Sequence, residues 1–323
     1  MRLVFAGTPD AAVPSLATLL GSHHEVVAVV SRPDAPAGRG RQLTPSPVAA
    51  LTREREIELL QPRRVRDEGF LDRLRELAPD CIPVVAFGAL VPAAALTIPR
   101  HGWVNVHFSL LPAWRGAAPV QHAVLHGDSL TGASTFALDE GLDTGPVYGS
   151  VTEPIATTDT SGEVLARLSQ SGAKLLLRTL DGIESGEAQP VPQASAGVSL
   201  APKLTTDDAR VDWSAPALHI DRLVRACSPA PGAWTTFRGE RLKLHSLRLM
   251  VEGGGQRPGE LPVGELPAGE LSAGELRVDK SHVLVGTGSY ELQIDQVQPQ
   301  GKRAMSGPDW VRGARAVTGD RLQ

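Results

Sequence analysis

Residues 103–112 read Trp-Val-Asn-Val-His-Phe-Ser-Leu-Leu-Pro, and residues 139–145 read Asp-Glu-Gly-Leu-Asp-Thr-Gly. The first stretch opens as an apolar run in which Asn105 and His107 stand two positions apart. Side chains at positions i and i+2 of a strand point to the same face, so we expect both to enter one cleft. Asp143 lies in a glycine-rich turn that can bring its carboxylate opposite them. An amide, an imidazole and a carboxylate together suit acyl transfer to an amine.

The first half of the chain alternates between strand-like and helix-like segments. Apolar runs indicate strands, and apolar residues at helical spacing indicate helices. Ser46 and Pro47 form a helix N-cap and first-turn pair. Pro83 lacks a ladder donor, so it is predicted to mark a strand start or a distortion. We expect strands at 2–6, 25–31, 81–87 and 103–107 and helices at 11–20, 67–77 and 161–180. This alternation predicts a mostly parallel sheet with helices on both sides.

Composition divides the 323 residues into parts. Residues 1–189 carry the alternation, residues 190–208 are rich in small residues and proline and are predicted to be a linker, and residues 209–323 contain short strand-like segments. The last part is therefore predicted to be a smaller β-barrel domain. Within it, Gly-Glu-Leu recurs at 259, 264, 269 and 274. That repeat predicts a low-complexity surface insertion at about 252–276.

Charge is unevenly distributed. The formal net charge is −4, and residues 251–276 hold five glutamates against one arginine. The last 24 residues hold five lysines and arginines against two aspartates, so a local basic surface is compatible with the acidic total. Residues 32–47 contain three arginines, four prolines and one acid. This segment is either an ordinary long loop or a functional one, and its charge suits a partner that carries phosphates.

Other patterns argue against several classes of protein. No Gly-x-Gly-x-x-Gly motif follows the first strand, which argues against a nicotinamide oxidoreductase. Cys81 and Cys227 show no paired metal or redox spacing and are expected to be reduced thiols. His23 and His24 are predicted to be a poor metal site, because no carboxylate or cysteine cluster accompanies them in the sequence. We expect neither a secretory signal nor a membrane span.

Further motifs resemble the methionyl-tRNA formyltransferase family. They are Phe5-Ala-Gly-Thr-Pro9, Arg32-Pro-Asp-Ala-Pro-Ala-Gly-Arg-Gly40, Ser109-Leu-Leu-Pro112, Trp114-Arg-Gly-Ala-Ala-Pro119, Gly141-Leu-Asp-Thr-Gly145 and Gly301-Lys-Arg-Ala-Met305. The resemblance spans nearly the whole chain. The Asn-x-His-x-Ser-Leu-Leu-Pro block is shared by the formyl-folate transferases, and the arginine loop with the C-terminal β-domain narrows the resemblance to the tRNA enzymes. It implies a Rossmann-like α/β formyltransferase domain followed by an OB-like barrel.

The resemblance also implies an activity. It is the transfer of the formyl group of 10-formyltetrahydrofolate to the α-amine of initiator methionyl-tRNA, without a metal. We expect a monomeric, cytoplasmic enzyme with no membrane partner. The implied catalytic residues are Asn105, His107 and Asp143, of which the first two would donate to the formyl oxygen and Asp143 would hold His107 and accept the amine proton. The implied folate contacts are Ser109, Leu110, Leu111 and Pro112, and the implied tRNA contacts are Arg32, Arg39, Arg41, Lys203, Lys302 and Arg303.

Three alternatives stay open at this stage. A formyltransferase acting on a sugar-nucleotide amine would share the fold and the three catalytic residues, but it does not need a long basic loop. A formyl-tetrahydrofolate hydrolase would use the same chemistry with water in place of the amine. A non-catalytic RNA-binding protein would not be expected to keep Asn105, His107 and Asp143 together.

Overall fold

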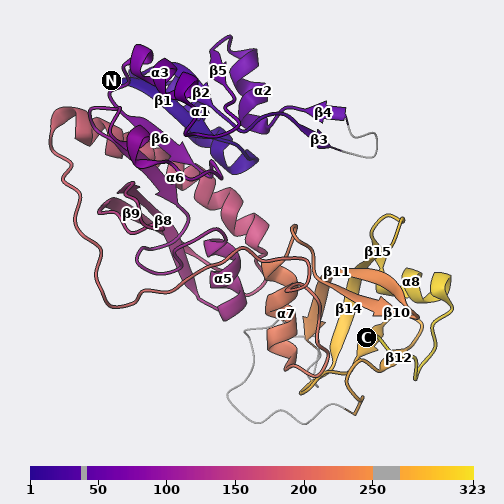
Figure 1. Ribbon diagram of the computed structural model, residues 1–323. Helices are drawn as coiled ribbons and strands as arrows, with labels where there is room; N and C mark the ends of the chain where they lie inside the picture. Colours follow the sequence, from indigo (N-terminus) through magenta and orange to yellow (C-terminus); the bar gives the residue numbers. More distant parts are fainter. Residues whose placement is uncertain (38–41, 250–269) are drawn as a thin grey trace. The chain divides into compact units, whose positions relative to one another are not determined.

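The computed structural model describes residues 1–37, 42–249 and 270–323 (Figure 1). These residues form two compact units. Unit 1 comprises Met1–Pro119, Leu130–Pro154 and Leu165–Ala201, and unit 2 comprises Val120–Ser129, Ile155–Val164 and Pro202–Gln323. The segment predicted to be a linker is divided between them, because its residues up to Ala201 group with unit 1. No helix within the described residues is long and apolar enough to cross a membrane.

Unit 1 is built on a seven-stranded sheet in the order β5-β2-β1-β6-β7-β8-β9. Its strands are β1 (Arg2–Gly7), β2 (Glu25–Val30), β5 (Glu58–Leu60), β6 (Ile82–Val85), β7 (Trp103–His107), β8 (Leu130–Ala137) and β9 (Val147–Pro154). The strands from β5 to β7 run parallel, whereas β8 and β9 pair antiparallel. The prediction of a mostly parallel sheet is therefore confirmed for five strands, and the whole sheet is mixed. The half-exposed residues of β9 suit an antiparallel edge.

Pro83 lies inside β6, a central strand, and interrupts one of its two ladders. The β6–β7 register is continuous from Ile82 to Val85. The β1–β6 ladder has a bridge at Cys81 and resumes only at Val84. The gap falls at Pro83, which has no N–H to donate. The predicted distortion is confirmed.

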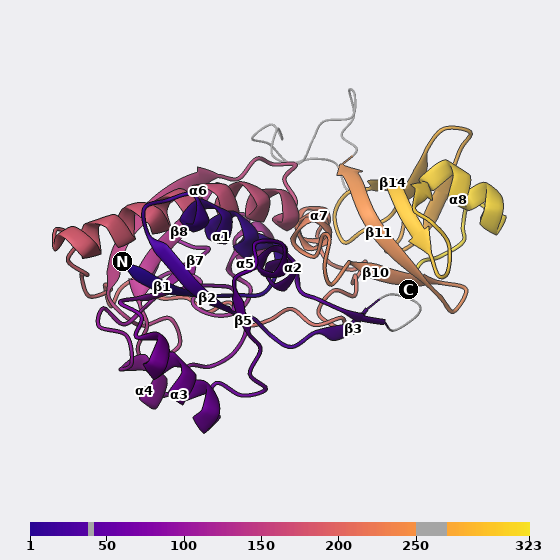
Figure 2. The ribbon, with the colours of Figure 1, turned by 90° about the horizontal axis from the view of Figure 1, so that it is seen from above.

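Helices cover both faces of the unit 1 sheet. Figure 2 shows α1 (Val13–Leu20) and α6 (Ser161–Ser185) on one face and α3 (Glu68–Leu77) and α4 (Ala93–Leu96) on the other. The strand alternation explains this, because Val4 and Ala6 of β1 join a buried cluster with α3. A 3₁₀ turn (Asp10–Ala12), α2 (Pro47–Glu54) and a small hairpin of β3 (Ala35–Ala37) and β4 (Gln42–Thr44) complete unit 1, whereas α5 (Pro119–His126) groups with unit 2 after its first residue. The predicted N-cap is confirmed, since Ser46 Oγ accepts a hydrogen bond from the Ala49 N–H at 3.1 Å.

Unit 2 contains a curled antiparallel sheet and helices α7 (Ala217–Ala226) and α8 (Gly307–Ala314), and all of α5 after its first residue also groups with it. The strands are β10 (Trp234–Phe237), β11 (Glu240–Leu249), β12 (Leu276–Val278), β13 (Val283–Val285), β14 (Leu292–Pro299) and β15 (Met305–Ser306). Trp310 of α8 stands edge-on to Phe237 with ring centroids 5.2 Å apart, and both belong to the unit 2 core. The predicted C-terminal β-domain is confirmed at this level.

The last Gly-Glu-Leu copy belongs to this sheet, so the predicted insertion boundary at 276 is wrong. Leu276 begins β12 and is fully buried. Gly274 has φ +77°, and a Cβ there would lie 2.4 Å from the Leu322 carbonyl oxygen. The copies at 259 and 264 lie outside the described residues, in the gap at 250–269, and of the copy at 269 only Glu270 and Leu271 are described. Identical tripeptides therefore gave no local signal of where the sheet resumes.

Candidate active site

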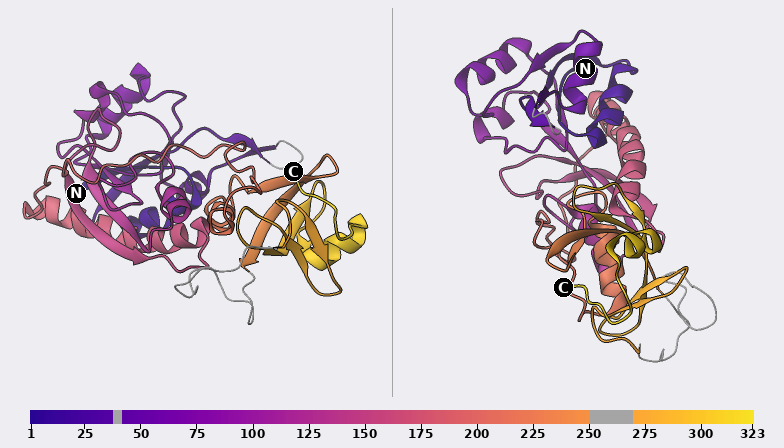
Figure 3. Two further views of the ribbon diagram at one scale, coloured as in Figure 1. Left: turned by 90° about the horizontal axis from the view of Figure 1, so that it is seen from below. Right: turned by 90° about the vertical axis from the view of Figure 1, so that its right-hand side faces the viewer.

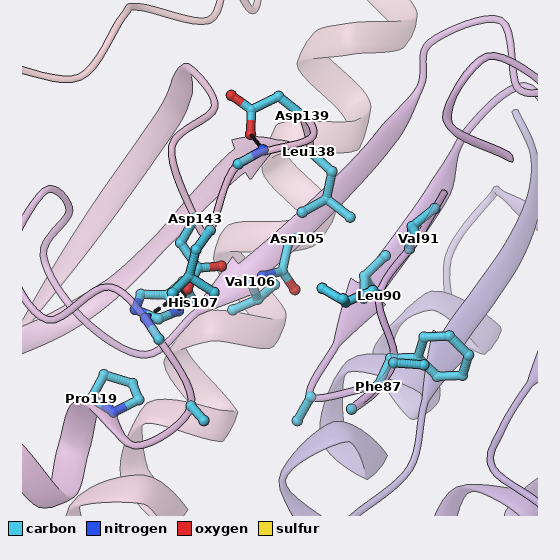
Figure 4. A pocket seen from close by; sticks show the side chains of 18 of the residues that line it. Phe87, Leu90, Val91, Asn105, Val106, His107, Pro119, Leu138, Asp139 and Asp143 are labelled. Atoms are coloured by element: carbon cyan, nitrogen blue, oxygen red, sulfur yellow. Dashed lines mark hydrogen bonds and ion pairs between the residues drawn. The ribbon is translucent and has the colours of Figure 1, made fainter. Parts of the chain in front are cut away.

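A cavity of about 580 Å³ opens at the carboxyl ends of β6 and β7, within unit 1 (Figure 4). This is where a parallel sheet places ligands, and the volume suits a small molecule. Asn105, His107 and Asp143 gather on one side of it, as Figure 4 shows. Apolar side chains line the rest, among them Phe87, Leu90, Val91, Leu138 and Leu142. The cavity thus joins three polar groups to an apolar wall.

Strand β7 places two of the polar groups. Asn105 and His107 both line the cavity; Val106 also borders it, and its Cγ1 lies close to Gly172 of α6. His107 is buried and Asn105 is half-buried. The predicted shared face of Asn105 and His107 is confirmed.

The protonation of His107 follows from its partners. Its Nε2 lies 2.8 Å from the Trp114 carbonyl oxygen, which only accepts, so Nε2 carries the proton. In the neutral ring Nδ1 is then unprotonated, and it lies 3.6 Å from Asp143 Oδ2. Burial lowers the pKa of His107, against a smaller raising effect of the Asp143 charge. The neutral ring therefore presents an unprotonated Nδ1, a hydrogen-bond acceptor, beside the carboxylate.

Asp143 is held by the turn predicted from the glycine-rich motif. Its backbone is left-handed, with φ 53°, and its Oδ2 accepts a hydrogen bond from the Gly116 N–H at 2.8 Å. Asp139 closes the turn, accepting from the Gly141 N–H at 3.0 Å and from Thr144 Oγ1 at 2.8 Å. The three polar groups predicted from residues 103–145 therefore meet, and the loop backbone is constrained around them.

Two residues near Asp143 were missed by the sequence reasoning. Gln193 and Ser199 come from the segment predicted to be a linker, and they bond to the loops that carry Asp143 and Trp114. Neither belongs to a periodic pattern or a motif. Two polar residues in a run of small residues and proline gave no local signal of a place beside the cavity.

A role of Ser109, Leu110, Leu111 and Pro112 in folate binding stays a prediction. None of Ser109, Leu110, Leu111 and Pro112 lines the cavity. Ser109 is fully buried and its Oγ donates to the Ala113 carbonyl at 2.6 Å, while the Leu111 N–H donates to Ser134 Oγ at 3.2 Å. These residues build the turn that follows β7. The wall facing the catalytic groups is made instead by residues 86–91 and 138–142.

The implied tRNA contacts that the structure describes are all exposed. Arg32 lines a second cavity of unit 1 together with Arg63. Lys203, Lys302 and Arg303 belong to unit 2, the last two in the turn between β14 and β15. Arg39 and Arg41 lie outside the described residues. A role of these six residues in tRNA binding stays a prediction.

The premise about His23 and His24 is wrong, because carboxylates do accompany them. His24 Nε2 lies 3.1 Å from Asp181 Oδ1, and His23 Nε2 lies 2.7 Å from Glu184 Oε2. Both carboxylates come from the end of α6, far away in the sequence. The Met1 amine also contacts Glu184, at 2.6 Å. Burial, followed by the charges of that amine and of His23, lowers the pKa of His24. The cluster ties α6 to the start of β2.

Comparison with known proteins gives the class first. Residues 1–180 match the family described as Formyl transferase, and residues 203–315 match Formyl transferase, C-terminal domain. The fold and the site are thus those of a formyltransferase. The relative named Methionyl-tRNA formyltransferase from Thermobifida fusca (strain YX) is 62% identical over 322 residues, covering 100% of this chain and 99% of the relative. The relative of the same name from Salinispora tropica is 60% identical and covers 100% of both chains. The chain belongs to the methionyl-tRNA formyltransferase family.

Solved structures share the fold at lower identity. The N-formyltransferase from Helicobacter canadensis, in complex with folinic acid and dTDP-3-aminofucose, aligns with a TM-score of 0.64 at 17% identity, over 93% of this chain and 99% of that chain. HypX from Aquifex aeolicus, in complex with tetrahydrofolic acid, aligns with a TM-score of 0.63 at 18% identity, over 99% of this chain and 48% of that chain. Both likenesses bear on the fold alone.

Proposed function

We propose that this chain transfers the formyl group of 10-formyltetrahydrofolate to the α-amine of initiator methionyl-tRNA. The observation that carries the proposal is the meeting of Asn105, His107 and Asp143 in one cavity. Full-length identity to methionyl-tRNA formyltransferases favours this acceptor over a sugar-nucleotide amine or water.

Each of the three polar groups has a separate role in the reaction. The amine nitrogen bonds to the formyl carbon, and the bond from that carbon to N10 of the folate breaks. The Asn105 amide donates to the formyl oxygen as it gains charge; one such donor contributes about 10²–10³ in rate. His107 Nδ1 accepts the proton that the attacking amine loses, and N10 takes up a proton as it leaves. Asp143 stabilises the imidazolium that forms in between.

This assignment differs from the implied donor role of His107. The Trp114 carbonyl accepts a hydrogen bond from the Nε2–H, so Nδ1 is an acceptor until it has received the amine proton. It can donate to the oxygen or to N10 only afterwards. The order of proton transfers therefore runs from amine to His107 and then to the leaving group.

We place the folate in the apolar part of the cavity. Phe87, Leu90 and Val91 offer a surface for a flat ring system, opposite the three polar groups. Ser109–Pro112 would act indirectly, by shaping the turn after β7. This placement replaces the direct folate contacts implied by the resemblance.

We assign residues 1–189 to the catalytic domain, residues 190–208 to its connection, and residues 209–323 to a tRNA-binding domain of the OB-like type. Arg32, Arg39, Arg41, Lys203, Lys302 and Arg303 are the proposed phosphate contacts. We further propose a monomeric enzyme that works in the cytoplasm.

An acceptor competition tests the activity. Purified chain is incubated with 10-formyltetrahydrofolate and with methionyl-tRNA, a UDP-amino-sugar or buffer alone. We expect rapid formylation of methionyl-tRNA and slow or absent turnover in the other two reactions. Preferred formylation of the sugar, or folate release independent of any amine, would refute the proposal.

Arg32→Ala tests the phosphate contact. Loss of one contact should raise KM for methionyl-tRNA and make the slope of log K against log salt shallower by about 1. KM for the folate should not change. Filter binding of methionyl-tRNA across a salt series measures the slope, and an unchanged slope would remove Arg32 from the interface.

A further inference from the structure

We infer that Gln193 and Arg115 are positioning residues that hold Asp143 and the partner of His107 in their catalytic arrangement. The inference rests on the proposed function. Both side chains belong to unit 1, and neither lines the cavity. Gln193 belongs to residues 191–201, called the strap below, and Arg115 bonds to it; the strap follows α6 and runs along unit 1, with a turn at residues 195–197 (Figure 3).

The strap is fastened at both ends by backbone hydrogen bonds. Val191 and Val147 exchange two bonds of 2.8 Å at the start of β9. At the other end the Arg115 N–H donates to the Ser199 carbonyl at 2.9 Å, and the Ala201 N–H donates to the Arg115 carbonyl at 2.7 Å. The strap thus bridges the start of β9 and the turn that carries Trp114.

Gln193 connects the strap to the Asp143 turn with both ends of its amide. Its Nε2 donates to the carbonyls of Asp143 and Gly145, each at 2.8 Å. Its Oε1 accepts from Arg115 Nε at 3.1 Å and from Arg115 Nη2 at 2.7 Å. Both donors and the acceptor of the amide are therefore used, and the guanidinium fixes which way round the amide sits.

The residues next to these hydrogen bonds have backbone dihedral angles that are unfavourable for residues other than glycine. Asp143 and Trp114 are both left-handed, with φ 53° and 58°. The Trp114 N–H donates to Ser199 Oγ of the strap at 2.9 Å, and the Trp114 carbonyl is the partner of His107 Nε2. The contact of His107 with Asp143 and its hydrogen bond to the Trp114 carbonyl thus depend on two left-handed residues that are held in place by bonds to the strap. Releasing them should move the Asp143 carboxylate away from His107.

The test replaces the amide by a side chain of similar length and no charge. We expect Gln193→Met to lower kcat about 10²-fold, because a shift of about 1 Å at a reacting group has this effect. KM for folate and for methionyl-tRNA should stay within a few-fold of wild type. Arg115→Met should show the same pattern from the other side of the amide. Gln189→Met, at an exposed glutamine just before the strap, is the matched control and should retain wild-type kcat.

The pH dependence separates positioning from general destabilisation. The Asp143 charge raises the pKa of His107, so withdrawing that charge should lower it. The His107 pKa, followed by NMR in the folate-free protein, should fall in Gln193→Met, as it does on removing the Asp143 charge. In an Asp143→Asn background Gln193→Met should have little further effect on kcat. An unchanged kcat, an unshifted His107 pKa, or full additivity with Asp143→Asn would each overturn the inference.

The NMR measurement does not depend on the acceptor. If wild-type protein failed to formylate methionyl-tRNA while the His107 pKa still fell in Gln193→Met, the proposed function would be wrong and the positioning role would stand. If wild type formylated methionyl-tRNA and the pKa did not move, only the positioning role would be wrong.

Discussion

Strand β7 and the turn at Asp139–Gly145 each supply polar groups that we propose are catalytic, but the two elements hold these groups by different means. Asn105 and His107 stand on a strand whose ladders run to β6 on one side and β8 on the other. Asp143 stands on a turn with a left-handed backbone, held by Gly116 and by Gln193 from the strap. Ladder bonds need no particular side chains, whereas the turn depends on individual ones. Substitutions in the two regions should therefore lower activity in different ways: on β7 by removing a reacting group, and in the turn by displacing Asp143.

The largest effect is expected on β7. His107→Ala should lower kcat by about 10²–10⁴-fold and Asn105→Ala by about 10²–10³-fold, because each removes a group that acts at the transition state. KM should change little, and kcat and kcat/KM should fall together. Steady-state kinetics measures kcat and KM, and thermal unfolding checks that each variant is folded. His101→Ala, a histidine outside the cavity before the same strand, is the control; a matching loss there would indicate damage to the strand.

The next effect concerns the turn. Gly145→Ala should displace it, since a Cβ there would lie 1.7 Å from the Ala137 carbonyl oxygen. We expect a loss of about 10²-fold in kcat from the movement of Asp143. Gly149→Ala in β9 is the matched control, because the nearest atom to its Cβ would be 3.5 Å away. If Gly145→Ala kept wild-type kcat, the turn would not be the element that places Asp143.

The smallest expected effect is a shift of the pH–activity profile in Asp143→Asn. It tests whether Asp143 of the turn acts on His107 of the strand. Burial holds the His107 pKa below its ordinary value of 6.5, and the Asp143 charge partly opposes this. His107 must be neutral to accept a proton, so activity should fall as pH drops through that lowered pKa. Asp143→Asn removes the raising charge and should move this acid limb to lower pH. The ratio of wild-type to variant kcat/KM, measured across pH with the same substrates, cancels the titration of the substrate amine.

A limb that moved to higher pH in Asp143→Asn, or did not move, would separate His107 from Asp143. The strand would then carry the proton transfer alone. The turn would then have no part in setting the protonation of His107.

Local patterns anticipated much of the fold and part of the site. The period of two in residues 103–107 placed Asn105 and His107 on one face, and the N-cap at Ser46 and the distortion at Pro83 were also confirmed. The antiparallel direction of β8 and β9 was not anticipated. Strand direction depends on the path of the chain between strands, and periodicity within a strand does not record it.

The structural features that the sequence did not predict share one cause. Gln193 reaches Asp143 across 50 residues, and Glu184 reaches His23 across 161 residues. Leu276 is buried, although its tripeptide recurs three times before it. In each case the contact is made by a chain that returns from a distance, so the neighbours in sequence hold no information about it.

The sequence by itself determined the class of the protein and predicted the residues that meet in its cavity, because motifs and strand period are local properties of the chain. It did not determine how those residues are held. Only the tertiary structure decided that the Trp114 carbonyl accepts a hydrogen bond from His107 Nε2–H, so that Nδ1 faces Asp143, and that the strap is bonded to both loops. The physical reason is that a proton position and a left-handed turn depend on partners supplied by distant segments once the chain has folded.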